Sequence, residues 1–402
     1  YEIGVRLVGS EMCIRDSNCM KKICGLTTLP ITIKSFMLGN LNYMADNGYK
    51  AYVISQPGEI LQKEHLGKVQ FIPLLIKHGN VSPLEVLKTI WTLYKIFKKE
   101  RFDIIQYATS NAALYASIAG WMARVPVRIY CQWGISYTDF HGVYLWFYKL
   151  MEKITCIFST SVQPDSPSNL KFSIQEGLYK ASKGHVLLNG SATGVDLTKY
   201  DCSMKKRWNK DIRDMYSVPQ DSFVFGFVGR LVPEKGINEL LEAFLSINGE
   251  KIYLFLVGPV EKNRLDSVLL AKAKDHPCVI FTGSVPNAAK YHAAFDFLVL
   301  PSYREGFGMT VVEAAALATP SIISRINGPT DFVQDEYNGL ICEVKSTESL
   351  KNKMEQALRL SKDEKEILSQ NAYQLVKTKF DSTMFKQEFL KNREYLLLLS
   401  KK

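Results

Sequence analysis

Residues 295–325 read "FDFLVLPSYREGFGMTVVEAAALATPSIISR", and this stretch decides the fold. The apolar run at 295–303 has the length of a buried strand and ends at a turn. The small and aliphatic residues of 310–318 indicate a buried helix, and residues 320–325 resemble a strand again. A strand, a helix and a second strand in succession predict a parallel unit with a helical crossover.

The same alternation runs through the whole chain, in two sets. Strand-like runs are separated by stretches long enough for crossover helices, which predicts parallel sheets with helices on both faces. We therefore expect an α/β protein of two facing Rossmann-like domains, each a doubly wound parallel sheet, with a cleft between them. The predicted strands are 21–28, 50–55, 69–74, 102–108, 127–132, 156–160 and 185–190 in the first set, and 223–229, 253–258, 278–283, 296–302, 320–325 and 339–344 in the second.

The domain bounds follow from where the first set of strands ends. Residues 20–190 are the predicted N-terminal domain, and residues 191–380 are the predicted C-terminal domain. The second domain opens with 191–210, which lacks periodicity and is the expected connection. Residues 381–402 resemble one amphipathic helix with no strand after it, and we expect this helix to cross back onto the first domain.

Residues 1–19 and the cysteines indicate in which cellular compartment the protein is expected. Residues 1–19 lack the basic start and apolar centre of a secretory signal. Within them, 7–17 resemble one reading frame of a sequencing adapter, so we interpret 1–19 as a non-native N-terminal extension before Met20. The eight cysteines form no CxxC pair and no cluster with histidine at metal-ligand spacing. These features favour a reducing cytoplasm.

The positive charge of the chain lies mainly in its first half. Residues 20–185 hold 19 Lys and Arg against 10 Asp and Glu, while the whole chain has a net charge of +10. A helix-like stretch at 89–102 combines lysines with aromatic residues, as a helix at an anionic bilayer surface does. An ordinary surface helix with solvated lysines explains the same pattern. We expect peripheral contact with the inner membrane at most, and no nucleic-acid partner, because no zinc-finger spacing or Arg-rich recognition helix is present.

Two glutamates of the opening stretch, Glu305 and Glu313, lie eight positions apart around a Gly-Phe-Gly. Glu305 falls in the loop after the strand and Glu313 one turn inside the helix, so both can face a ligand at the helix N-terminus. Gly306 and Gly308 leave the backbone bare there, which lets free amides approach an anion. The pattern predicts a phosphate cradle between two carboxylates. Either glutamate alone could instead complement the helix dipole.

Two further strand ends extend this site. Arg230 follows the strand at 223–229 and Lys235 comes five residues later, and two cations on one loop suit a diphosphate. A Gly-Ser turn follows the strand at 278–283, and its backbone could border a nucleobase. No DxD occurs in the chain, so we expect no metal and no other cofactor. The Gly-Ser turn comprises Gly283, Ser284 and Val285.

The stretch "EGFGMTVVE" resembles the E-x7-E motif of retaining family 4 glycosyltransferases with the GT-B fold. The stretches "GRLVPEKG", "LVGP", "FTGSV" and "NGPTDFV" have the order and spacing of that family. "PSYREGFG" and "NGSATGVD" resemble the subgroup that builds capsule, O-antigen and related bacterial surface glycans. The resemblance covers the chain from Met20 to its end and is most specific in the second half.

The resemblance implies roles for individual residues. Glu305, which contacts the donor sugar, and Arg230 and Lys235, which bind the donor diphosphate, would form the catalytic set. Glu313 would bind the ribose of the nucleotide. In the acceptor half, Gln132 and Trp133 occupy the loop where many members carry a histidine. Further donor contacts are implied for Gly306, Phe307, Gly308, Met309 and Thr310.

The implied activity is transfer of a hexosyl or N-acetylhexosaminyl group from a nucleotide-sugar, with UDP as the expected nucleotide. The acceptor would be a glycan or a polyprenyl-diphosphate-linked sugar, and the expected location is the cytoplasm or the cytoplasmic face of the inner membrane. Same-face substitution would retain the anomeric configuration. A nucleotide-sugar epimerase of the same fold and a non-catalytic nucleotide-sugar-binding subunit are the alternatives.

Overall fold

The computed structural model of the chain contains two six-stranded sheets, and it describes residues 20–58, 61, 65–77, 81–135, 137–138, 140–261 and 264–401. The predicted N-terminal extension therefore lies outside the described residues. The first sheet has the order β3-β2-β1-β4-β5-β6, and β1 pairs in parallel with β2 and with β4. Its strands are β1 (Lys22–Leu26), β2 (Lys50–Ser55), β3 (Gln70–Pro73), β4 (Ile104–Tyr107), β5 (Val127–Gln132) and β6 (Ser161–Pro164).

The second sheet repeats this winding, with the order β12-β11-β10-β7-β8-β9. β7 pairs in parallel with both β8 and β10, although β10 comes three strands later in the chain. This is the doubly wound order in which the direction of winding reverses at the centre of the sheet. The strands are β7 (Phe223–Val228), β8 (Ile252–Val257), β9 (Val279–Gly283), β10 (Phe297–Leu300), β11 (Ser321–Ser324) and β12 (Gly339–Cys342).

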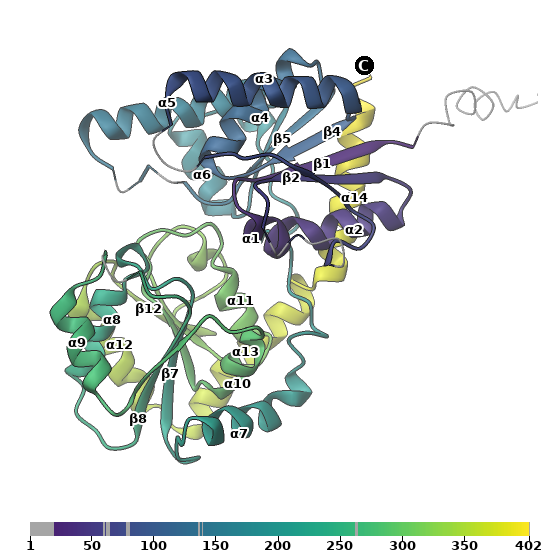
Figure 1. Cartoon of the computed structure of the whole chain (residues 1–402). Coiled ribbons are helices and arrows are strands. Elements are labelled where there is room, and N and C mark those ends of the chain that lie inside the picture. Colours follow the sequence, from purple (N-terminus) through teal and green to yellow (C-terminus); the bar gives the residue numbers. More distant parts are fainter. Residues whose placement is uncertain are drawn as a thin grey trace, which may run out of the picture. The chain divides into compact units, whose positions relative to one another are not determined.

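Helices cover both faces of the first sheet. Gly25 of β1 is in register with Gln106 of β4, so both face the same side of the sheet, where Gly25 lies against Met37 of the π-helical turn and Leu41 of α2. The neighbouring Ile105 faces the opposite side, toward Gly120 of α4. Figure 1 shows α3 packed along α4. The helices are α1 (Pro30–Thr32), α2 (Leu38–Asp46), α3 (Pro83–Glu100), α4 (Ser110–Met122), α5 (Gly142–Phe158) and α6 (Pro167–Gln175), with a π-helical turn at Ile33–Met37.

The second sheet is covered in the same way. Figure 1 shows α8, α9 and α12 on one side, and α7, α10, α11 and α13 on the other. The core here is largely aromatic and aliphatic, with Phe225, Phe255 and Phe297 fully buried. The helices are α7 (Lys205–Met215), α8 (Ile237–Leu245), α9 (Ser267–Asp275), α10 (Ala288–Ala294), α11 (Met309–Ala315), α12 (Thr347–Arg359), α13 (Lys362–Lys379) and α14 (Ser382–Leu399).

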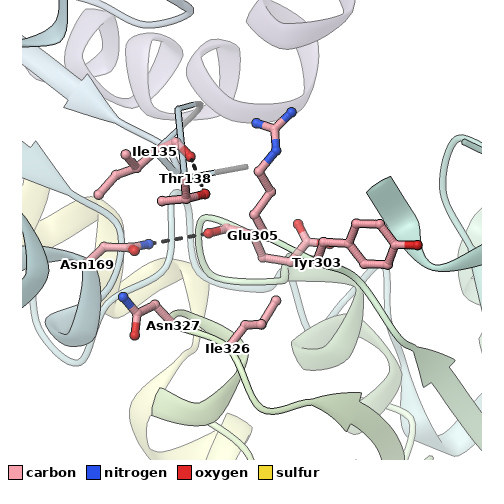
Figure 2. Close-up of a pocket in the computed structure, with 8 residues that line it drawn as sticks. Ile135, Thr138, Asn169, Tyr303, Glu305, Ile326 and Asn327 are labelled. Carbon is pink, nitrogen blue, oxygen red and sulfur yellow. Dashed lines mark hydrogen bonds between the residues drawn. The ribbon is translucent and has the colours of Figure 1, made fainter. Parts of the chain in front are cut away.

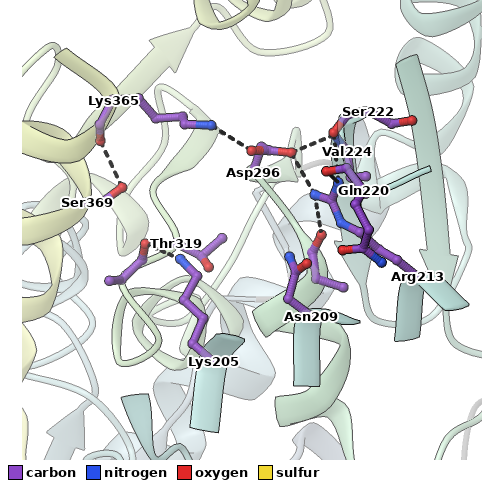
Figure 3. A network of polar contacts seen from close by, with 12 residues as sticks. Lys205, Asn209, Arg213, Gln220, Ser222, Val224, Asp296, Thr319, Lys365 and Ser369 are labelled. Atoms are coloured by element: carbon purple, nitrogen blue, oxygen red, sulfur yellow. Dashed lines mark hydrogen bonds and ion pairs between the residues drawn. The ribbon is translucent and has the colours of Figure 1, made fainter. Parts of the chain in front are cut away.

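A charged network ties β10 to the helices around it (Figure 3). The Asp296 carboxylate accepts hydrogen bonds from Arg213 Nη2 at 3.0 Å, from the Val224 amide at 2.9 Å and from Lys365 Nζ at 2.7 Å. Arg213, only 4% exposed, also donates to the Ser222 carbonyl at 2.8 Å. Because both ions have several partners, the cost of burying them is offset locally. The network holds the start of β10, which carries the candidate site at its other end.

These sheets confirm the predicted α/β fold of two doubly wound domains, but two predicted strands are wrong. The run at 156–160 is the end of α5 and the residues that follow it, and the strand comes later, at Ser161–Pro164. A short apolar run cannot separate a strand from the last turn of a helix. Residues 185–190 form no strand in the described chain; only Gly184, just before them, makes an isolated bridge to Val162.

By its internal contacts the chain divides into two compact units. One holds the described residues of 1–129 and 393–402, and the other holds Tyr130–Asn392. The division runs through β5, so the units differ from the two sheets, and the domain bounds 20–190 and 191–380 stay predictions. Arg393 of α14 is fully buried and donates to Gln106 of β4 at 3.0 Å, so the end of the last helix packs on the first sheet as expected.

Candidate functional site

Two neighbouring strands of the second sheet end in loops that carry charged side chains. The loop after β7 leads to Lys235, and the loop after β10 carries Glu305. Since β7 and β10 are adjacent and parallel, both loops leave the same edge of the sheet, at the point where the winding reverses. Open α/β sheets bind their ligands at this position.

Lys235 and Glu305 form an ion pair across the two loops. Lys235 Nζ lies 2.6 Å from Glu305 Oε1, and the Ser302 hydroxyl donates to the same oxygen at 2.8 Å. The side chains are 24% and 12% exposed, so solvent screens the pair only partly. Lys235 has two further N–H donors, and Glu305 Oε2 accepts no hydrogen bond from the described residues. Both partners therefore retain capacity to bind a ligand.

Gly236 explains why the two loops come so close. Its φ is +71°, and a Cβ at this position would lie 2.0 Å from the carbonyl oxygen of Pro301. Only glycine allows both this backbone conformation and this approach. The sequence "EKG" (234–236) thus places a cation and the residue that brings it to the next loop side by side.

The second glutamate, Glu313, lies on α11 with a side chain that is 27% exposed. Burial raises the pKa of the nearby Tyr200 hydroxyl well above its ordinary value, and the Glu313 carboxylate adds to the rise. His292 Nε2 lies 3.8 Å away on the fully buried side. Neither ring nitrogen of His292 has a hydrogen-bond partner in the described chain. On its buried side, Glu313 is therefore next to Tyr200 and His292.

The other residues predicted to bind the nucleotide-sugar donor differ in their exposure and contacts. Arg230 is 57% exposed and pairs with Glu261 at 2.9 Å, so no described contact joins it to Lys235 or Glu305. Gly283 has a φ of +69° and open space around it, Ser284 is exposed, and Val285 packs against the core. Their roles toward a diphosphate and a nucleobase stay predictions.

The Gly-Phe-Gly anchors the start of α11. Phe307 is 1% exposed and packs against Phe380 with ring centroids 5.4 Å apart, so its side chain belongs to the core. Gly308 caps α11 with a φ of +81°, and Met309 packs on the same core. Thr310 Oγ1 is buried and has no partner within the described residues. A backbone role for this segment remains a prediction.

A pocket opens beside Glu305 (Figure 2). Beside Arg304, Tyr303 and Glu305, its lining includes the Thr138 hydroxyl and the amides of Asn169 and Asn327, and Asn169 Nδ2 donates to the Gly306 carbonyl at 2.8 Å. Amides and hydroxyls of this kind can bind sugar hydroxyls. The lining residues are Ile135, Thr138, Asn169, Tyr303, Arg304, Glu305, Ile326 and Asn327, all within the unit Tyr130–Asn392.

Gly306 is enclosed by other backbone segments on several sides. A Cβ on Gly328 would lie 2.0 Å from the Gly306 carbonyl oxygen, and one on Gly134 would lie 3.1 Å from the Gly306 amide nitrogen. A Cβ on Gly306 itself would lie 2.2 Å from Asp165 Oδ2. Three glycines therefore let three loops meet at the residue next to Glu305.

Gln132 and Trp133, the predicted residues of the acceptor half, differ in their access to a ligand. Gln132 is fully buried, donating to Glu152 at 2.6 Å and accepting from Ser173 at 3.0 Å and Tyr179 at 3.1 Å. Its polar atoms are thus engaged inside the protein. Trp133 is partly exposed, and its backbone lies against Gly306.

Sequence reasoning missed the segment around α6. Ser168 donates from its hydroxyl and its amide to Asp331 Oδ2, at 2.6 and 2.9 Å, and its hydroxyl accepts from the Gly328 amide at 2.8 Å. Together with the bond from Asn169 to the Gly306 carbonyl, these bonds connect the start of α6 to the loop after β10 and to the segment of Gly328 and Asp331. The only signal in the sequence was "DSPS" (165–168), which also reads as an ordinary helix start with Ser166 as cap.

Two doubly wound sheets, with a charged site at the switch point of the second, are the architecture of GT-B glycosyltransferases. The family model "Glycosyl transferases group 1" matches residues 209–375, and "Glycosyl transferase 4-like" matches residues 23–163. The chain therefore belongs to the family 4 glycosyltransferases, as its motifs predict, and it is a transferase.

Among curated relatives, the capsular polysaccharide biosynthesis glycosyltransferase CapM of Staphylococcus aureus is 28% identical over 92% of this chain and 95% of its own. The UDP-Gal:alpha-D-GlcNAc-diphosphoundecaprenol alpha-1,3-galactosyltransferase of Escherichia coli is 28% identical over 70% of this chain and 72% of its own. Among solved structures, Anabaena Alr3699/HepE in complex with UDP-glucose superposes with a TM-score of 0.75 at 18% identity, covering 93% of this chain and 99% of the other.

Gly328→Ala tests the close approach at Gly306. The φ of +94° disfavours alanine, and the added Cβ would push the Gly306 carbonyl away from its position. Because a displacement of about 1 Å in a site can cost about 10²-fold in rate, we expect kcat/KM for the donor to fall by about that factor.

Gly177→Ala is the matched control for this change. Its φ is +66°, and its Cβ would meet no atom within 4 Å. It should lose about 1–2 kcal/mol of stability through backbone strain alone and keep its kcat/KM. A Gly328→Ala enzyme with wild-type kcat/KM would show that the approach does not position the site.

Proposed function

We propose that the protein transfers a hexosyl or N-acetylhexosaminyl group from a UDP-sugar to a polyprenyl-diphosphate-linked acceptor, with retention, in the synthesis of a bacterial surface polysaccharide. The observation that carries this proposal is the Lys235–Glu305 pair at the switch point of the second sheet. The names of the two curated relatives support the acceptor and the biological role. UDP appears in the name of one of them and in the Anabaena complex.

The chemistry expected of Lys235 is stabilisation of the leaving group. As the bond from the sugar to the diphosphate breaks, negative charge grows on the phosphate oxygen, and a fixed ammonium group lowers the energy of that state. Lys235 is held by Glu305 and keeps two N–H donors for the phosphate. Arg230 would join it only by leaving Glu261, which its exposure permits.

Glu305 would position the sugar. Its Oε1 is occupied by Lys235 and Ser302, so Oε2 can accept hydrogen bonds from sugar hydroxyls in the adjacent pocket. On the same face of the sugar, the leaving phosphate would take the proton of the acceptor hydroxyl, which keeps the anomeric configuration. We further propose that this reaction needs no metal ion, because the cationic side chains offset the phosphate charge.

Glu313 would bind the ribose hydroxyls of the nucleotide. Tyr200 and His292 lie on the buried side of its carboxylate, while the exposed part can accept hydrogen bonds from a ligand. The two glutamates would then serve the two ends of one nucleotide-sugar. Their substitution should therefore have different kinetic consequences.

Glu313→Gln should raise the Kd for free UDP by about tenfold, because a hydrogen bond to a charged group contributes about 1.5–3 kcal/mol. Glu305→Gln should leave UDP binding nearly intact and lower kcat by about 10²-fold, since free UDP lacks the transferred sugar that Glu305 would contact. Calorimetric titration with UDP and steady-state kinetics with the UDP-sugar separate the two effects.

Glu348→Gln makes the same chemical change at an exposed position of α12 and should alter neither quantity. The assignment fails if Glu305→Gln abolishes UDP binding while turnover at saturating donor stays near wild type. That outcome would reverse the orientation of the nucleotide-sugar.

We also propose peripheral contact with an anionic membrane at the cytoplasmic face, where a polyprenyl-linked acceptor resides. Lys95, Lys98 and Lys99 are exposed on α3, with Trp91 beside Lys95 at 5.7 Å. On α5, Trp146 is 65% exposed and its apolar neighbours are also open to solvent. Among the described residues, no helix is both long and apolar enough to cross a membrane.

Charge reversal of Lys95, Lys98 and Lys99 to Glu should weaken binding to anionic vesicles by about tenfold or more, since each basic residue near the surface contributes about 1 kcal/mol. Added salt should weaken the wild type in the same direction. Reversal of the exposed Lys272, Lys274 and Lys290 changes the net charge equally and is the control. Equal losses from both triple variants in vesicle sedimentation would show a net-charge effect and no membrane-facing helix.

A further inference from the structure

Asp165 is a buried carboxylic acid beside the site that the chemistry above does not use. It follows β6 directly and is 5% exposed. Its Oδ1 is buried without a hydrogen-bond partner in the described chain. Its Oδ2 lies where a Cβ on Gly306 would come within 2.2 Å, so the carboxyl group touches the backbone that carries Glu305.

The two charged groups that raise the pKa of Asp165 are acidic. Glu305 approaches from the loop after β10, and Asp331 from the short helical turn Pro329–Asp331. The neutral amide of Asn169 lies beside it on α6. The one ammonium group near this cluster with a described contact, Lys235, is bonded to Glu305. An ionised Asp165 would therefore add a third negative charge in a buried place, where no described residue forms an ion pair with it.

Burial is the main cause that raises the pKa of Asp165 to about 8, and Glu305 and Asp331 add to the rise. The backbone amide of Asp165 and the Asn169 side chain act in the opposite direction. At neutral pH the group is consequently protonated in the folded protein. An uncharged carboxyl group can lie against Gly306 and near Glu305 without electrostatic repulsion.

We infer that Asp165 is a positioning residue of the donor site, whose carboxyl group must keep its proton for the Glu305–Gly306 loop to hold its place. Loss of the proton would set Asp165 against Glu305 and displace the loop from Lys235. The inference rests on the proposed function, and it assigns an upper pH limit to the activity of the same site. It concerns a residue that does not itself line the pocket and takes no part in bond breaking.

The first test measures the stability of the folded protein as a function of pH, so it does not depend on activity. The folded pKa of Asp165, about 8, lies above that of an unfolded aspartate, near 3.9. Between these values the folded state binds a proton that the unfolded state releases, so wild-type stability falls as pH rises through this window and levels off above it. One proton changes the unfolding constant by about tenfold per pH unit.

Asp165→Asn mimics the protonated acid and cannot titrate. The melting temperature of this variant minus that of the wild type should increase from pH 4.5 to pH 8 and then stay constant. The readout is how this difference in melting temperature changes with pH. A packing defect that lowers the melting temperature equally at every pH does not obscure it. Asp165→Ser, also neutral, gives the same slope if the asparagine variant does not fold. A difference that is independent of pH would overturn the inference.

Asp331→Asn is the control within the same cluster. The Asp331 carboxylate accepts two hydrogen bonds from Ser168, so its loss should lower the melting temperature without removing the slope of the wild type. If Asp331→Asn instead removed that slope, the titrating group would be Asp331, and the assignment to Asp165 would be wrong.

The second test measures how the activity depends on pH. Above about pH 8, kcat/KM of the wild type for the UDP-sugar should fall about tenfold per pH unit, and Asp165→Asn should lack this decline. If no UDP-sugar is a substrate, the melting slope still decides the state of Asp165, so failure of the proposed function and failure of the inference are distinguishable. A decline that persists unchanged in Asp165→Asn would show that another group sets the alkaline limit.

Discussion

The ion pair between Lys235 and Glu305 is the interaction on which the candidate site depends. It joins the loops that follow β7 and β10, the two strands at which the winding of the second sheet reverses. The approach of Gly236 to the Pro301 carbonyl allows the pair to form at 2.6 Å. A cation and a carboxylate that neutralise each other at low exposure can bind a charged diphosphate and a neutral sugar side by side, because neither is left as an isolated buried charge.

Backbone contact sets the second constraint, around Gly306. Gly134 and Gly328 approach it closely enough that no side chain fits between, and Asp165 lies against its Cα. Packing of this kind has few intermediate arrangements, since a shift of one loop must move the others. The position of Glu305 is thus determined by groups from three segments that are distant in sequence. This dependence explains why we expect residues outside the pocket to influence the reaction.

The parts predictable from sequence are those whose cause is local. Alternating strands and helices and the charged residues at two strand ends have signals within a few positions of themselves. Asp165 had no such signal, because its importance arises from burial against Gly306, which lies 141 residues later. Gln132 was misleading for the opposite reason: a polar residue at a strand end can face Glu152 inside the protein instead of a ligand. The strand at 161–164 was missed because its sequence, "SVQP", is mostly polar although all four residues are buried.

Transfer to a lipid-linked acceptor is the most direct test of the proposed activity. The protein is incubated with UDP-hexoses and UDP-N-acetylhexosamines, with and without an undecaprenyl-diphosphate-linked sugar, in the presence of EDTA. We expect release of UDP that requires the acceptor, and a product whose anomeric configuration, determined by nuclear magnetic resonance, is that of the donor. An inverted product, or an activity abolished by EDTA and restored by a divalent cation, would contradict the proposal.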